Sequence, residues 1–113
     1  MHLHNTIAAN RKSWALSQRE LGLLLATCRA NVSRLEIKAG LTSLTTALAL
    51  QALFNTSVSE LFPDEFRKAA ALIVPRIADF SVDLEHQIGD AADRKRELLS
   101  SVAERLSLAE LGL

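Results

Sequence analysis

A short run of long hydrogen-bond donors and small side chains lies in the first third of the sequence. Between residues 29 and 35, Val32 and Leu35 are the clearly apolar positions, so two residues would anchor this segment. The remaining positions form a polar side at helical spacing and are Arg29, Ala30, Asn31, Ser33 and Arg34. Guanidinium and carboxamide groups can each form two hydrogen bonds with one base edge in the DNA major groove. A short helix of this composition has the side chains that groove entry requires.

Residues that could carry other chemistry have no suitable partners in the sequence. We find no paired carboxylates in a cleft-like context, no nucleophile with a nearby histidine and no phosphate-cradling loop, so we expect neither an enzyme nor a cofactor. His2 and His4 have no further ligands nearby, and a frayed terminus is favoured over a metal site. Cys28 is the single cysteine, and a structural role is favoured over a redox switch.

Composition and charge favour a helical protein with a basic first part. The chain has 113 residues, of which 49% are hydrophobic, while four glycines and two prolines favour helices over strands. No apolar run is long enough for a membrane span and no secretory signal is visible, so a cytoplasmic protein is expected. Formal net charge is zero, but residues 1–40 carry +4 and residues 41–113 carry −4. Local positive charge of this kind suits phosphate contacts, although an ordinary solvated surface explains it equally well.

Periodicity predicts five helices before Pro63. Their expected ranges are Asn5–Ala15, Gln18 to about Leu25, Arg29–Ile37, Leu44–Phe54 and Val58–Phe62. Ser17 and Glu20 have the spacing of a capping box, and Ser43 or Thr42 is expected to cap the fourth helix. The second helix would bury Leu21, Leu24 and Leu25, and Trp14 is expected in the core.

The segment from Gln18 to Leu35 meets the requirements of a helix-turn-helix. Gly22 supplies a small residue where the two helices touch, and the turn between them is short. The apolar anchors on both helices are Leu21, Leu25, Val32 and Leu35. This combination of spacings is considerably more specific than a single glycine motif.

The segments LSQRELGLLLATCRANVSRLEIKAG and SLTTALALQALFNTSVSELF resemble the Cro/CI-type helix-turn-helix, the XRE family of bacterial and phage regulators. The resemblance covers roughly residues 5–63. It implies an all-α, five-helix (lambda repressor-like) domain whose third helix enters the major groove.

Two positions depart from the family pattern. Ala26 replaces the usual turn glycine, which would cost roughly 1 kcal/mol if that position needs positive φ. Cys28 replaces the usual capping Ser or Thr, so Thr27 could cap with a shifted helix start.

The resemblance also implies roles for individual residues. Base contacts are expected from Arg29, Ala30, Asn31 and Arg34. Phosphate contacts are expected from Gln18 and, with weaker support, from Lys12, Arg19, Lys38, Thr42 and Ser43. Arg11 and Glu36 match positions that form an intradomain ion pair, and we expect a structural role for both.

The composition of the chain changes after Pro63, so we expect a DNA-binding domain at 1–63 and a helical extension at 64–113. An apolar stripe at alternating spacings of four and three is typical of a helix that packs against another helix. Its members are Phe66, Ala70, Ile73, Ile77, Phe80 and Leu84. Pro75 should kink or interrupt this helix, and Leu98, Val102 and Leu106 would continue an apolar face. A homodimer or partner interface is favoured over an extension that folds back onto its own domain.

Three functions remain in consideration. The leading one is a sequence-specific transcriptional regulator, acting as a dimeric repressor on double-stranded DNA. The second is the antitoxin of a toxin–antitoxin pair, whose C-terminal region would bind the toxin. The third is a protein-interaction module that kept the fold and lost DNA binding, with which the zero net charge and acidic tail are compatible.

Overall fold

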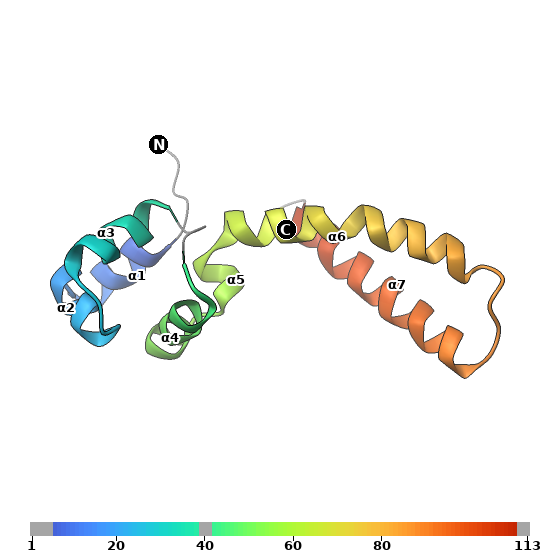
Figure 1. Ribbon diagram of the computed structural model, residues 1–113, viewed down its shortest axis with the longest axis horizontal. Helices are drawn as coiled ribbons and strands as arrows, with labels where there is room; N and C mark the ends of the chain where they lie inside the picture. Colours follow the sequence, from blue (N-terminus) through green and yellow to red (C-terminus); the bar gives the residue numbers. More distant parts are fainter. Residues whose placement is uncertain (1–5, 39–41, 111–113) are drawn as a thin grey trace. The chain divides into compact units, whose positions relative to one another are not determined.

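The structure is a computed structural model that describes residues 6–38 and 42–110, with side chains described up to Leu106. All elements in these ranges are helices, so the fold class is all-α (Figure 1). The helices are α1 (Ile7–Ser13), α2 (Gln18–Leu24), α3 (Arg29–Ile37), α4 (Leu44–Phe54), α5 (Val58–Leu61), α6 (Pro63–Leu84) and α7 (Asp90–Glu110). The chain divides into two compact units, Met1–Phe66 and Arg67–Leu113.

The first unit has a core to which its first five helices and the residue before α6 contribute. Its buried members are Ile7, Leu21, Val32, Leu35, Ala47, Leu50, Phe54, Leu61 and Phe62, and Leu16, Leu25 and Val58 pack against them. Burial of such side chains contributes about 1.5–3 kcal/mol each. Two core predictions were wrong, because Trp14 is 68% exposed and Leu24 is 57% exposed. Trp14 is the C-cap residue of α1 and directly follows the last helical residue, Ser13.

The ends of α1 and α2 are shaped by two alanines in the left-handed region. Ala15 has φ 58° and Ala26 has φ 56°. In each case the alanine N–H and the following N–H bond back to carbonyls of the preceding helix, at Lys12 and Arg11 for the first helix. This is the Schellman arrangement, which normally uses glycine. The first helix therefore ends at Ser13, not at Ala15 as predicted, and the predicted start at Asn5 lies outside the described residues.

Serine caps begin α2, α4 and α5. The hydroxyl of Ser17 accepts from the Glu20 N–H at 3.0 Å, and the Glu20 carboxylate accepts from the Ser17 N–H at 2.8 Å. For α4 the capping residue is Ser43, which accepts from the Thr46 N–H, and not the alternative Thr42. The fifth helix ends at Leu61, one residue earlier than predicted.

Proline takes two different positions in α6. Pro63 occupies its first position, where a missing N–H costs nothing because that group has no partner within the helix. Pro75 lies inside the helix, and of the predicted kink or interruption the interruption does not occur, because α6 continues through it to Leu84. The Pro75 ring is exposed, and ideal periodicity places it opposite the apolar stripe.

The second unit pairs α6 with α7 through a short connection that contains Gly89, whose φ is +112° (Figure 1). Arg96 holds this end of the pair together. Its guanidinium donates to the Leu84 carbonyl at 2.6 Å, to the Gln87 carbonyl and to the Asp93 carboxylate at 3.0 Å. Of the predicted apolar face of α7, Leu106 is buried and Leu98 is 59% exposed, while Ala92, which was not predicted to belong to it, is also buried. No described helix is long and apolar enough to cross a membrane.

Candidate nucleic-acid interface

The second helix and the turn after it approach each other closely at Gly22. A Cβ added to Gly22 would lie 3.0 Å from the Thr27 carbonyl oxygen and 3.3 Å from the Cys28 carbonyl carbon. Both atoms are backbone atoms, so a larger side chain would displace the turn itself. Gly22 therefore sets the distance between α2 and the start of α3, as its position in the sequence predicted.

Cys28 begins α3 without capping it through its side chain. It has extended backbone angles, φ −102° and ψ 162°, and its sulfur makes no cap hydrogen bond. The predicted takeover by Thr27 does not occur. The Thr27 hydroxyl instead accepts a hydrogen bond from the Asn31 side-chain amide at 2.8 Å. The first N–H groups of α3 thus receive no side-chain cap from either residue.

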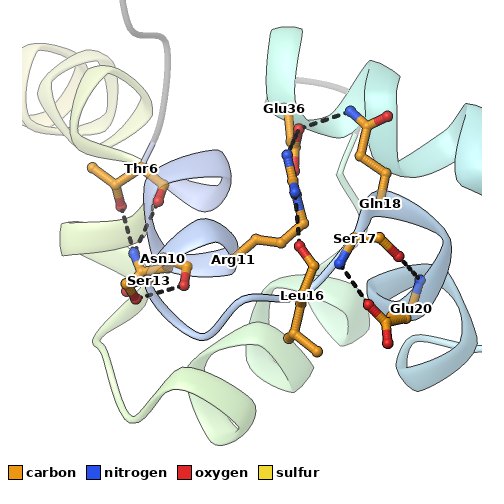
Figure 2. Close-up of polar contacts among 9 residues, drawn as sticks. All are labelled: Thr6, Asn10, Arg11, Ser13, Leu16, Ser17, Gln18, Glu20 and Glu36. Carbon is orange, nitrogen blue, oxygen red and sulfur yellow. Dashed lines mark hydrogen bonds and ion pairs between the residues drawn. The ribbon is translucent and has the colours of Figure 1, made fainter.

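An ion pair between the first and third helices fixes the orientation of α3 (Figure 2). Arg11 Nε lies 2.7 Å from Glu36 Oε2, and the two side chains are 10% and 8% exposed. Arg11 Nη2 also donates to Glu36 Oε1 at 3.3 Å, so the contact is bidentate. A third bond, from Arg11 Nη1 to the Leu16 carbonyl at 2.8 Å, ties the loop before α2 to the same guanidinium.

Gln18 joins this cluster, which the residue pattern did not predict. Its side-chain amide donates to Glu36 Oε1 at 3.0 Å (Figure 2). A carboxamide nitrogen has two hydrogens, so one remains for a phosphate oxygen while the other holds Glu36. Gln18, the expected phosphate contact at the start of α2, is thus hydrogen-bonded to the ion pair that positions α3.

The outer side of α3 carries a chain of side-chain hydrogen bonds. Arg34 Nη1 donates to Asn31 Oδ1 at 2.9 Å, and Asn31 Nδ2 donates to the Thr27 hydroxyl at 2.8 Å. Asn31 and Arg34 are exposed, whereas Val32 and Leu35 are buried on the other side of the helix. The two donors are thereby oriented before any ligand binds, while Arg34 keeps further N–H groups for an external acceptor.

A polar cleft of about 330 Å³ borders this side of α3. It is lined by Leu25, Thr27, Asn31, Arg34, Leu35, Lys38, Thr42, Ser43 and Thr46. Five expected contact residues therefore come together here, two for bases and three for phosphates. Thr27 had been considered only as a helix cap and Thr46 had not been singled out, although the spacing of four between Thr27 and Asn31 is a signal that could have identified Thr27 as part of this cleft.

Thr42 and Ser43 differ in their suitability for phosphate contact. The hydroxyl oxygen of Thr42 is buried and has no hydrogen-bond partner among the described residues. Ser43 is exposed at the start of α4, where the free N–H groups and the helix dipole favour an anion. Of the two expected residues, Ser43 is the better placed.

The other expected contacts lie outside the cleft. Arg29 and Ala30 are exposed in the first turn of α3, Lys12 is exposed in the last turn of α1, and Arg19 is exposed in the first turn of α2. Glu36, the acidic residue within α3, is neutralised by Arg11. The outer side of α3 and the residue after it therefore present three cations, Arg29, Arg34 and Lys38, which would attract a polyanion.

No family model, curated protein or solved structure matches this chain. The assignment of this surface therefore depends on its own geometry and charge.

Proposed function

We propose that this chain is a sequence-specific, double-stranded DNA-binding regulator of the Cro/CI type that reads the major groove with α3. The observation that carries the proposal is the hydrogen-bonded chain of Thr27, Asn31 and Arg34 on the exposed side of a helix anchored by Val32 and Leu35. In a groove, Arg34 would donate two hydrogen bonds to a guanine, and Asn31 would pair with an adenine.

Reading an adenine requires both ends of the Asn31 carboxamide. In the free protein its oxygen accepts from Arg34 and its nitrogen donates to Thr27. These bonds are exposed, so exchanging them for bonds to a base costs little net free energy. Arg34 and Asn31 would therefore respond to neighbouring base pairs as a coupled pair.

Phosphate contacts would hold α3 in register with the groove. Lys38 and Ser43 border the cleft next to α3, and Gln18 lies at the start of α2 with one amide hydrogen available. Such contacts fix position without reading sequence. In our proposal the protein acts as a homodimeric repressor in the cytoplasm. Its two copies would bind the two half-sites that members of this family recognise.

The test is selection of bound fragments from random DNA by the full chain, followed by affinity measurements across a salt series. We expect a defined sequence to be enriched and affinity to fall steeply as salt rises. Arg34→Ala should reduce affinity for the selected sequence by about tenfold or more. Arg94→Ala is the matched control, because it removes an exposed arginine from α7. Enrichment of no sequence, or equal losses in the two variants, would contradict the proposal.

One observation favours a protein-interaction module as the second candidate. An apolar cleft of about 350 Å³ in the first unit is lined by Trp14, Leu16, Leu24, Leu53 and Phe54. Exposed aromatic and leucine side chains of this kind are typical of protein contacts. If the protein is such a module, this cleft would be a contact surface for its partner. A module that has lost DNA binding would retard no DNA fragment even at low salt.

A further inference from the structure

Two apolar rows run along α6, and they differ in burial. The first row consists of Ala70, Ile77 and Leu84, of which Ala70 and Leu84 are buried. The second row consists of Phe66, Ile73 and Phe80, which are 37%, 40% and 41% exposed. Within each row the spacing is seven residues, the repeat of helices that pack along their length. One row is therefore covered in the folded chain and the other is not.

The seventh helix accounts for the covered row. It has its own row at the same spacing, Ala92, Leu99 and Leu106. Ile77 and Leu84 line a cleft of about 330 Å³ together with Leu99 and other residues of α7. The helices α6 and α7 thus meet through these rows, and space remains between them.

The hairpin has a small core for a unit of its length. The buried apolar residues between Arg67 and Leu106 are Ala70, Leu84, Ala92 and Leu106, and two of these are alanines. Small units with so little buried surface usually need a disulfide, a metal or a partner subunit. The single cysteine of the sequence is Cys28, so no disulfide can join α6 to α7.

Both helices contribute to one apolar side of the hairpin. Because α6 and α7 run antiparallel (Figure 1), ideal periodicity places Leu98 and Val102 on the same side as the second row of α6. We call this side the hairpin face. It consists of the second-unit residues Ile73, Phe80, Leu98 and Val102.

The hairpin face supplies much of the apolar area that a dimer needs. With about 200 Å² for a large apolar side chain, its exposed fractions correspond to roughly 300 Å². A standard interface buries about 800 Å² on each partner, of which about 60% is apolar. More than half of the apolar share of such an interface is therefore present on this face.

Charges at the edge of the face favour a second copy of the same chain. Arg76 and Asp83 are exposed on α6, lie seven residues apart and form no ion pair among the described residues. The Arg76 guanidinium donates to the Leu72 carbonyl of its own helix. In an antiparallel pair of α6 helices that cross near Phe80, each Arg76 would meet the Asp83 of the other copy. A parallel pair would instead bring like charges together.

We propose that the hairpin face binds a second copy of this chain, with the two α6 helices antiparallel and crossing near Phe80, so that four helices enclose one core. The inference rests on the homodimer of the proposed function and specifies its interface. Four-helix arrangements of this kind are a common way for helix pairs to complete a core.

The first test measures the mass of the full chain in solution by sedimentation, without DNA. The unmodified protein should be a dimer at micromolar concentration. Phe80→Asp should be monomeric, because it buries an unpaired carboxylate in the contact. Val82→Asp is the matched control on the same helix, since Val82 is exposed and lies away from the hairpin face, and it should remain dimeric. A monomeric unmodified protein, or equal effects of the two variants, would overturn the proposal.

The second test uses charge reversal, which leaves the apolar core unchanged. Arg76→Glu and Asp83→Arg should each weaken the dimer about tenfold. An equimolar mixture of the two variants should form heterodimers. In these, position 76 of each copy again meets an opposite charge at position 83 of the other copy: Glu with Arg in one pair and Arg with Asp in the other. The affinity of the heterodimer should therefore return to nearly the original value. The double variant should also recover. If neither recovers, the antiparallel arrangement is wrong. Arg34→Ala should leave dimerisation unchanged, so failure of DNA binding and failure of this interface can be told apart.

Discussion

Arg11 and Glu36 are 25 positions apart in the sequence, yet their side chains form a bidentate ion pair with Nε and Oε2 2.7 Å apart. Around this pair, Leu16 and Gln18 complete the hydrogen bonding of the guanidinium and the carboxylate. The pair connects α1, the loop before α2 and the third helix. The orientation of α3 therefore depends on this one nearly buried contact. The direction of its outer side, which carries Arg34, depends on the same contact.

Glu36→Ala should lower the free energy of unfolding by about 3 kcal/mol, because it leaves the Arg11 charge nearly buried without its partner. Urea unfolding followed by circular dichroism measures this change. Glu104→Ala, which removes an exposed carboxylate from α7, is the control and should change stability by about 0.5 kcal/mol or less. Equal effects of the two substitutions would show that the pair does not stabilise the domain.

Ala26→Gly should stabilise the protein, and Ala15→Gly should do the same. Both alanines have positive φ at a helix end, where glycine avoids the steric cost of Cβ. After allowance for the greater freedom of glycine in the unfolded chain, we expect a gain of about 0.5–1 kcal/mol at each position. Ala52→Gly, at an exposed position inside α4, should instead cost about 1 kcal/mol. A melting temperature that falls in all three variants would contradict this account.

The capping box of α2 should be visible in the titration of Glu20. A hydrogen bond from the Ser17 N–H, and a second from the Ser17 hydroxyl, hold the pKa of this carboxyl below its ordinary value of 4.5. A lowered pKa in the folded state means that the contribution to stability is present above the pKa of the unfolded chain and is lost as pH falls through the folded pKa. Side-chain carboxyl chemical shifts in NMR report the titration. Ser17→Ala keeps the backbone N–H and removes the hydroxyl, so it should raise the Glu20 pKa only part of the way to its ordinary value, and an unchanged pKa would contradict the contribution of the hydroxyl.

Lys38→Ala should weaken binding to all DNA sequences by a similar factor. Lys38 follows α3 at the border of the polar cleft, and a lysine–phosphate contact carries no sequence information. Its loss should reduce the slope of log affinity against log salt by about one. Titrations with selected and unrelated duplexes at several salt concentrations measure both effects. A loss confined to the selected sequence would mean that Lys38 contacts a base.

The sequence predicted best where the signal was local. The predicted bounds of α3, Arg29–Ile37, agree with the structure, because two apolar anchors and a polar side specify one helix face. Gly22 and the Ser17–Glu20 capping box likewise follow from spacing alone. The Arg11–Glu36 contact was expected through the family resemblance, since nothing local links residues so far apart.

The wrong predictions concern features that depend on tertiary packing or on unusual backbone angles. The end of α1 was misplaced because alanine, unlike glycine, gives no signal for positive φ at residue 15. Trp14 was assigned to the core at helical spacing from Ile7, although its position at a helix end leaves it exposed. The bond from Gln18 to Glu36 joins two helices, so no periodicity within either helix could indicate it.

The most direct test of the central claim is a double-mutant cycle on Asn31 and Arg34, measured as affinity for the selected DNA relative to unrelated DNA. Each single alanine variant should lose about 1–3 kcal/mol of this discrimination. Because the two side chains share a hydrogen bond, the losses should not add, and the double variant should retain non-specific binding. All variants should keep the helical circular dichroism of the unmodified protein. If the double variant discriminates between the two sequences as well as the unmodified protein does, α3 is not the reading helix.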